Sequence, residues 1–262
     1  MTAASYSRDF YQGLLKAGRL EAREAASYRL GPGFILAYDL GPAAAWRTLV
    51  VDRNRGELLV KKSTKALLAA FINQDLPGGY PLQKKLCDLL EIKEQHVISA
   101  GHGAIFSPSS LHAPLVDLVA LQQMRQLDHD QGCLALTDLA GNNRYLFETP
   151  RGYARARQQL QEAVEHNALY CALFHGLAGR VGCPACSRLG DWNLLYAPRY
   201  QQAVEAVLAE KGLSLRGLLA EIREEKRLAL RQLLVEDMAL PLLAVDLDYA
   251  LKEVEKKFSF KI

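Results

Sequence analysis

Four residues in the second half of the chain carry side chains that bind zinc, at spacings that let them share one ion. The pattern is Cys-x3-His-x7-Cys-x2-Cys, formed by Cys171, His175, Cys183 and Cys186. Residues four apart on a helix lie on one face, about 5 to 6 Å apart at Cβ, and the final cysteine pair has a spacing common in zinc sites. Four protein ligands close the site, so we expect a structural zinc whose binding energy contributes to folding.

The same cluster has three other interpretations. The pair Cys183 and Cys186, in Cys-Pro-Ala-Cys, is similar to a glutaredoxin-type dithiol redox centre. That chemistry calls for a strand before the pair, whereas a helical pattern and a glycine-rich stretch precede it. An iron–sulfur cluster is the second alternative. The third is a site without cofactor, in which Cys171 is a small buried residue and His175 interacts with the helix end.

Basic and aromatic residues are densest between residues 144 and 157. The members of this group are Arg144, Tyr145, Arg151, Tyr153, Arg155 and Arg157. Arginine binds phosphate and tyrosine stacks on bases, so the group predicts contact with RNA or another single-stranded nucleic acid. A second basic cluster surrounds an expected hairpin and contains Arg53, Arg55, Lys61, Lys62 and Lys65. The alternative for both groups is a solvated charged surface.

The segment His129-Asp130-Gln131-Gly132 closes an expected helix and resembles the HD phosphohydrolase family. The resemblance covers these four residues. It implies a divalent metal bound by adjacent His129 and Asp130, further histidine and aspartate ligands, and an all-helical bundle. The simpler alternative is a histidine that favours the helix C-terminus and a glycine that caps it.

A loop containing Ser107-Pro108-Ser109-Ser110 precedes the same expected helix. Free backbone N–H groups at a helix N-terminus can hold a phosphate. No lysine follows in the Walker pattern and no Gly-x-Gly-x-x-Gly is present, so an ordinary capped loop is the alternative.

The elements that must position these residues divide the chain near residue 149. Strands are predicted over residues 34–40, 46–53, 57–61, 133–138 and 144–147. Helices are predicted over residues 8–30, 64–71, 81–90 and 109–127, the last with an alternative start at residue 114. From residue 150 the pattern is helical, over 151–177, 200–210, 215–237 and 247–257, with Ser214 as an N-cap.

We therefore expect an α+β fold. Residues 1–149 would form a mixed part with short antiparallel strands, and residues 150–262 a mainly helical part around the zinc knuckle, the two being separate or one continuous domain. Cys87 and Cys133 are expected in the core.

The composition sets the class of protein. Thirty-two Lys and Arg against 29 Asp and Glu leave a net charge of +3, which singles out no partner, and five cysteines are too few for a disulfide scaffold. No apolar run is long enough for a membrane helix and no signal peptide is evident, so we expect a cytoplasmic protein without a membrane partner. The sequence predicts a zinc-stabilised binding or assembly protein that contacts nucleic acid or a nucleoprotein complex. The alternatives are a metal-dependent phosphohydrolase using His129 and Asp130, or a dithiol redox protein; no catalytic residue is assigned.

Overall fold

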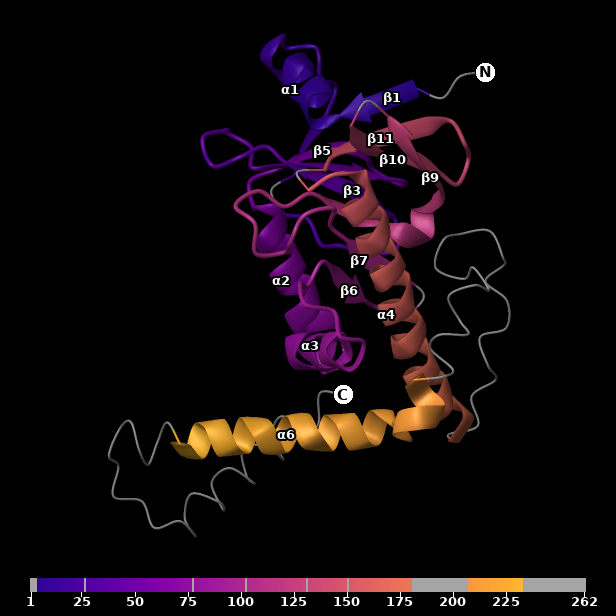
Figure 1. Cartoon of the computed structure of the whole chain (residues 1–262). Helices are drawn as coiled ribbons and strands as arrows, with labels where there is room; N and C mark the ends of the chain where they lie inside the picture. The colour runs from indigo at the N-terminus through magenta and orange to yellow at the C-terminus, as the bar shows by residue number, and fades with distance from the viewer. Residues whose placement is uncertain are drawn as a thin grey trace. The chain divides into compact units, whose positions relative to one another are not determined.

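The computed structural model describes residues 4–25, 27–76, 78–101, 103–130, 132–149, 151–180 and 207–232, with backbone alone at 175–180, 215, 226 and 229–232. The chain divides into two compact units, Met1–Gly212 and Leu213–Ile262, which are described separately. The described residues contain both strands and helices, so the fold is mixed α+β as expected (Figure 1). Residue 149, the expected boundary, lies within the first unit.

The larger sheet of the first unit holds seven strands of the described residues, in the order β2-β5-β4-β3-β8-β7-β6. Its neighbours pair antiparallel, except that β2 runs parallel to β5. The strands are β2 (Arg23–Ala25), β3 (Phe34–Asp39), β4 (Thr48–Asp52), β5 (Gly56–Val60), β6 (Val97–Ser99), β7 (Ala104–Phe106) and β8 (Leu118–Ala120). The predicted hairpin of β4 and β5 is confirmed, and Gly56 supplies the positive φ of 74° that its turn requires.

The smaller sheet has the order β1-β11-β10-β9 within the described residues. Its strands are β1 (Ala4–Ser7), β9 (Met124–Asp130), β10 (Cys133–Asp138) and β11 (Asn143–Glu148). β10 pairs antiparallel with both β9 and β11, and β1 adds to β11 in parallel. A 3-10 turn, η1 (Leu121–Gln123), joins β8 directly to β9 and so carries the chain from one sheet to the other.

Side-chain alternation along β3 builds a core on each face of the larger sheet. Leu36 and Tyr38 face one way and pack with Leu134 of the smaller sheet and Leu160 of α4 (Tyr153–Arg180). Ala37 faces the other way, in a cluster with apolar residues of α2 (Thr64–Asp75). The larger sheet is therefore the middle layer, with α2 on one face and the smaller sheet and α4 on the other (Figure 1).

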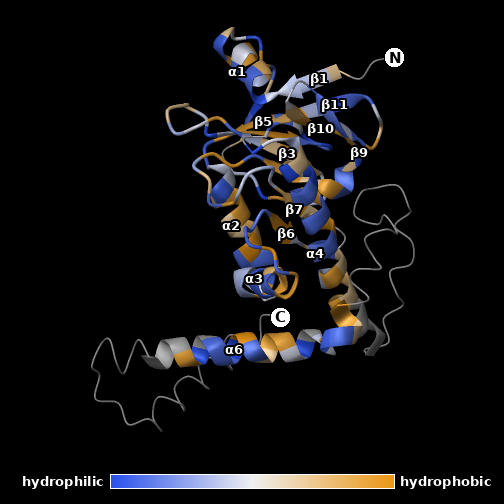
Figure 2. Ribbon diagram, viewed as in Figure 1, coloured by the Kyte–Doolittle hydropathy of each residue, from blue (hydrophilic) through white to orange (hydrophobic). Residues whose placement is uncertain are grey.

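Helix positions follow from local caps and from burial. Ser7 caps α1 (Arg8–Lys16) by accepting from Phe10 N, and Ser63 caps α2 by accepting from Ala66 N. α3 (Gly79–Leu89) buries Leu82, Leu86 and Cys87 and contacts α2 and α4. The strands β6 and β7 and helix α2 are rich in hydrophobic residues in Figure 2. Cys87 is buried as expected, and Cys133 is half-buried.

Two predicted helices are wrong. The helix predicted over residues 8–30 ends at Lys16, because Gly18 turns the chain with φ 65° and residues 23–25 pair with β5. The helix predicted over residues 109–127 is absent from the described residues there, which form β8, η1 and most of β9. Its apolar run is fully buried between β3 and β7, and a short buried strand has the same composition as a buried helix segment.

The helical pattern after residue 150 is partly described. Helix α4 matches the prediction over residues 151–177, and residues 207–211 are helical. In the second unit, α6 (Leu215–Gln232) follows the predicted cap, since Ser214 Oγ accepts from Gly217 N at 3.1 Å. The prediction over residues 247–257 lies outside the described residues. Within the described part of the chain, no helix is both long and apolar enough to cross a membrane.

Candidate ligand pocket at the start of α4

The predicted zinc ligands are described only in part. Cys171 lies on α4, where its Sγ donates to Gly101 O at 2.9 Å and burial raises the pKa of its thiol to about 11. His175 lies one turn further along the same helix, as the predicted spacing requires, and its side chain is outside the described residues. Cys183 and Cys186 also lie outside the described residues. The zinc prediction therefore stays a prediction.

His129 and Asp130 lie on strand β9, not at the end of a helix as the sequence pattern predicted. Neighbouring residues on a strand point to opposite faces. The His129 ring lies 4.7 Å from the ring of Tyr153, and Asp130 accepts from Arg144 Nη1 at 2.7 Å. No group of three or more His, Cys, Asp or Glu residues in the described part of the chain is placed to hold a metal ion. The phosphohydrolase alternative therefore stays a prediction, and the residues expected to end a helix lie on a strand instead.

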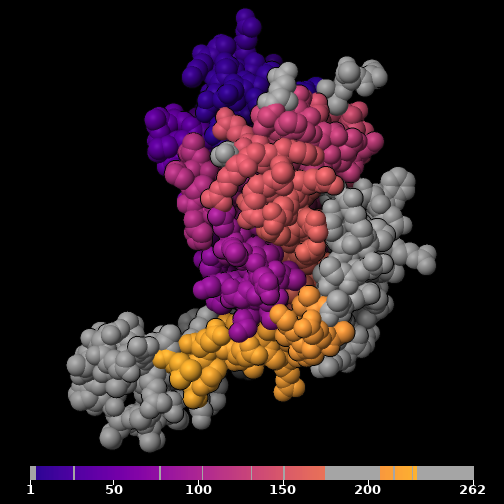
Figure 3. All heavy atoms as spheres, in the orientation of Figure 1, coloured from indigo at the N-terminus to yellow at the C-terminus, as the bar shows by residue number. Residues whose placement is uncertain are grey.

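The six predicted nucleic-acid contacts lie on β11 and at the start of α4, with different exposure. Tyr145 is 3% exposed and belongs to the core, so its ring is not presented to a ligand. Arg144 pairs with Asp130, and Arg155 pairs with Glu162 at 3.3 Å. The remaining three, Arg151, Tyr153 and Arg157, are on or next to the first two turns of α4, a region at the surface in Figure 3. Arg151 and Arg157 are exposed and Tyr153 is half-buried.

The second basic cluster surrounds β5. All five of its side chains are exposed: Arg53, Arg55, Lys61, Lys62 and Lys65. The guanidinium of Arg55 lies 5.8 Å from the ring centre of Tyr28, and Lys61 Nζ lies 5.4 Å from that of Trp46. These distances are those of cation–π contacts, in which the charged group itself lies over the ring, and both side chains remain exposed.

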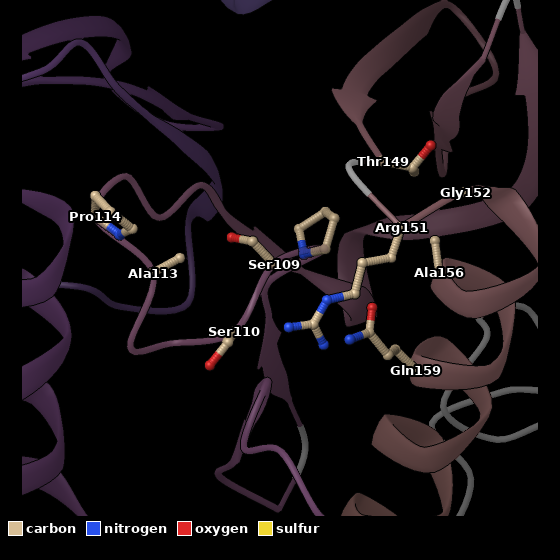
Figure 4. A pocket seen from close by; sticks show the side chains of 10 residues that line it. Ser109, Ser110, Ala113, Pro114, Thr149, Arg151, Gly152, Ala156 and Gln159 are labelled. Atoms are coloured by element: carbon tan, nitrogen blue, oxygen red, sulfur yellow. The ribbon is translucent and has the colours of Figure 1, made fainter.

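A pocket of about 310 Å³ opens where α4 begins. One wall is the loop between β7 and β8, and the other is formed by the residues leading into α4 and its first two turns (Figure 4). The lining residues are Pro108, Ser109, Ser110, Ala113, Pro114, Thr149, Arg151, Gly152, Ala156 and Gln159. Four of these, Pro108, Ser109, Ala113 and Pro114, also line a second pocket of about 290 Å³, which Arg8, Asp117 and Glu148 help to form.

Arg151 provides the positive charge of the first pocket. Its side chain is 60% exposed, and its Nη1 donates to both carboxylate oxygens of Glu94. The Arg151 guanidinium lowers the pKa of Glu94, so that carboxylate is charged at neutral pH. The other two guanidinium nitrogens, Nε and Nη2, have no hydrogen-bond partner in the described part of the chain. Within the described part of the chain, three N–H donors, one on Nε and two on Nη2, therefore remain for water or a ligand.

Gln159 provides a neutral polar group deeper in the same pocket. The residue is only 3% exposed, yet its side-chain amide has no hydrogen-bond partner among the described residues; its main-chain O accepts from His96 Nε2 at 2.9 Å. Figure 4 shows the side chains of Arg151 and Gln159 extending from the α4 side toward Ser109 and Ser110. The amide nitrogen and oxygen are not among the fully buried unpaired atoms of the described residues, so they reach the pocket space, where water or a ligand can pair with them.

The fold and the pocket thus define a mixed α+β protein with an arginine-bearing, ligand-sized pocket. Comparison with known proteins found no matching family model, no matching curated protein and no matching solved structure.

Sequence reasoning identified only part of this pocket. Arg151 belonged to the predicted contact group, and the loop Ser107-Pro108-Ser109-Ser110 was considered for phosphate binding. The helix N-terminus beside that loop is the start of α4, not a helix in the following residues. No sequence pattern identified Gln159 as a pocket residue, because it is one of several glutamines on a helix rich in polar residues.

Proposed function

We propose that this chain is a zinc-stabilised binding module that contacts single-stranded nucleic acid through the start of α4. The main observation behind this proposal concerns Arg151, a predicted contact residue. It lines a pocket, and two of its guanidinium nitrogens have no partner within the described residues. Arginine with spare donors is the usual ligand for phosphate. The exposed cations around β5 support the same function. A single-stranded nucleic acid longer than the contact at α4 has a further basic surface available in this cluster.

Binding of a fluorescein-labelled single-stranded RNA, followed by fluorescence anisotropy, tests this function. We expect affinity to fall steeply between about 50 and 200 mM salt, because each neutralised phosphate releases counterions. Changing Lys61, Lys62 and Lys65 together to Gln should flatten the slope of log K against log salt by about 0.7 for each phosphate that these lysines neutralise. A wild-type chain that binds neither RNA nor single-stranded DNA at low salt would contradict the proposal.

The zinc component rests on the four-residue spacing and on the placement of Cys171 and His175 one turn apart on α4. Cys171 would exchange its hydrogen bond to Gly101 O for a thiolate–metal bond, and zinc would supply a fixed link between α4 and the segment with Cys183 and Cys186. The burial of Cys171 suits a structural zinc ligand, because structural zinc sites are closed to water.

Elemental analysis of protein purified without added metal tests this component. We expect about one zinc per chain, less than a tenth of that in Cys186→Ser, and an unchanged content in Cys87→Ser, whose thiol is buried in α3. Chelation should lower the melting temperature of the wild-type chain. Iron in place of zinc, or no metal together with insensitivity to chelator, would rule the zinc site out.

A further inference from the structure

We propose that the pocket at the start of α4 takes one 5′-phosphorylated nucleotide, with the phosphate on Arg151 and the base beside Gln159. This inference rests on the proposed nucleic-acid contact and specifies its chemistry. The pocket volume of about 310 Å³ is at the lower end of the range for small-ligand sites, roughly 300 to 1,000 Å³, which suits one nucleotide unit.

The phosphate end of the pocket combines three kinds of donor. Arg151 offers Nε and Nη2, which have no partner among the described residues. The first backbone N–H groups of α4 follow Gly152, which also lines the pocket, since α4 begins at Tyr153. Helix N-termini attract anions through these N–H groups and the helix dipole. The hydroxyl of Ser110 completes the polar rim.

The base end is apolar with one hydrogen-bonding group. The prolines Pro108 and Pro114, on the loop between β7 and β8, and Ala156, on α4, contribute aliphatic surface from opposite walls, between which a base can pack (Figure 4). Gln159 is nine-tenths buried or more and its amide has no partner within the described residues, so it both donates and accepts toward whatever enters. Single-stranded bases are read in this way, by hydrogen bonds to an exposed edge. The pairing of one arginine with one buried amide thus fits a phosphate joined to a base better than a bare anion.

Glu94 sets the affinity of the phosphate end. Its carboxylate holds Nη1 of Arg151 and places a negative charge next to the phosphate position. Because Glu94 is charged at neutral pH, it both orients the arginine and weakens anion binding. Removing that charge while keeping the size of the side chain should therefore strengthen binding, the opposite of the effect expected at Arg151.

Competition by the four 5′-mononucleotides, by uridine and by inorganic phosphate against a labelled oligouridylate tests the pocket. At least one mononucleotide should compete tenfold better than phosphate, and uridine should fail. Arg151→Gln should weaken mononucleotide binding by roughly tenfold and Glu94→Gln should strengthen it several-fold, whereas Arg125→Gln, an exposed arginine on β9 away from the pocket, should not change it. Gln159→Leu should reduce discrimination among the bases, and Gln158→Leu, exposed on the same helix, should not. Circular dichroism melts verify that each variant folds.

The outcomes separate this inference from the proposed function. If the oligonucleotide binds with salt dependence but no mononucleotide competes, or Arg151→Gln equals Arg125→Gln, the pocket inference is overturned and the proposed function stands. If phosphate competes as well as every mononucleotide, the base does not enter and the inference is overturned. If isothermal titration calorimetry shows that mononucleotides bind directly and that Arg151→Gln abolishes this, while no oligonucleotide binds, the pocket is supported and the proposed function fails.

Discussion

Replacing Asp117 by alanine is expected to lower the free energy of unfolding by about 3 to 5 kcal/mol. Asp117 is 7% exposed, and its two carboxylate oxygens hold different elements together. Oδ2 accepts from Arg8 Nη2 at 2.6 Å, at the start of α1, and Oδ1 accepts from Asp39 N at 2.9 Å, at the end of β3. Asp39 in turn accepts from Thr64 Oγ1 at 3.0 Å, at the start of α2. Alanine would leave the Arg8 guanidinium and the Asp39 N–H without this acceptor.

The expected loss of stability comes from the groups that Asp117→Ala leaves unpaired, rather than from the net strength of the ion pair with Arg8. Burial raises the pKa of Asp117 above its usual value even though Arg8 opposes that shift, so the desolvation of the carboxylate is not fully offset. Asp117→Asn keeps an acceptor for Asp39 N and should cost less, about 1 to 2 kcal/mol. Urea unfolding followed by circular dichroism measures both. Asp128→Ala is the matched control: among the described residues its carboxylate is hydrogen-bonded only to Gln126, and its loss should change stability by about 0.5 kcal/mol or less. An Asp117→Ala variant as stable as this control would refute the assignment.

Stability is expected to fall as the pH is lowered from 6.5 to 4, because two buried histidines resist protonation. Burial lowers the pKa of His96 and of His166 to about 4. His166 is fully enclosed: its Nδ1 lies 2.7 Å from Ser99 Oγ and its Nε2 lies 3.0 Å from Gln83 O. The carbonyl of Gln83 only accepts, so Nε2 carries the proton and Nδ1 accepts from Ser99. Protonation would reverse this second bond, with Nδ1 donating to Ser99 Oγ, and would place a positive charge in a fully buried position.

The direction of this pH effect follows from the proton uptake of histidine in the unfolded and the folded chain. Unfolded histidine takes up a proton near pH 6.5, whereas these two take it up near pH 4 in the folded chain. Between those values the unfolded state binds more protons, so the free energy of unfolding falls by roughly 1.4 kcal/mol per pH unit for each histidine. Above about pH 6.5 neither histidine contributes a pH dependence. Burial also raises the pKa of Glu162, which lies 3.3 Å from His96 Nε2, so the slope of the wild-type chain is compared with that of a variant.

Urea unfolding at several pH values between 4 and 7 measures this slope. His166→Gln should remove about half of it, whatever its effect at pH 7. A free energy of unfolding that is constant across the interval, or a slope equal in His166→Gln and wild type, would contradict burial of these neutral histidines.

Local sequence patterns suffice for much of the fold. The strands β3, β4, β5, β10 and β11 and the helices α2, α3 and α4 lie near their predicted places, because periodic apolar residues and serine caps act within a few residues. The hairpin turn at Gly56 was found for the same reason. By contrast, the segments that became β8 and β9 were predicted as a helix, since an apolar run of that length fits either state until its neighbours are known.

The candidate site depended even more on long-range packing. The spacing of Cys171 and His175 on one helix could be predicted from the sequence, because a helix brings residues four apart together. The placement of Arg151 opposite Glu94, 57 residues earlier, and beside Ser109 and Ser110 could not. Those contacts form only when α4 packs on β6 and β7. The exclusion of Tyr145 from the surface has the same origin, as alternation on β11 turns it toward the core.

The sequence by itself determined the α+β class, most of the strands and helices, and the chemistry available: a zinc-type set at Cys171, His175, Cys183 and Cys186, and a basic group from residue 144 to 157. The tertiary structure decided which of those side chains meet a ligand-sized space. It buried Tyr145, paired Arg144 with Asp130, and left Arg151 and Gln159 at one pocket with donors and acceptors that no described residue uses. The physical reason is that residue type and spacing set what a side chain can bind, whereas burial and pairing by distant residues set what remains free to bind.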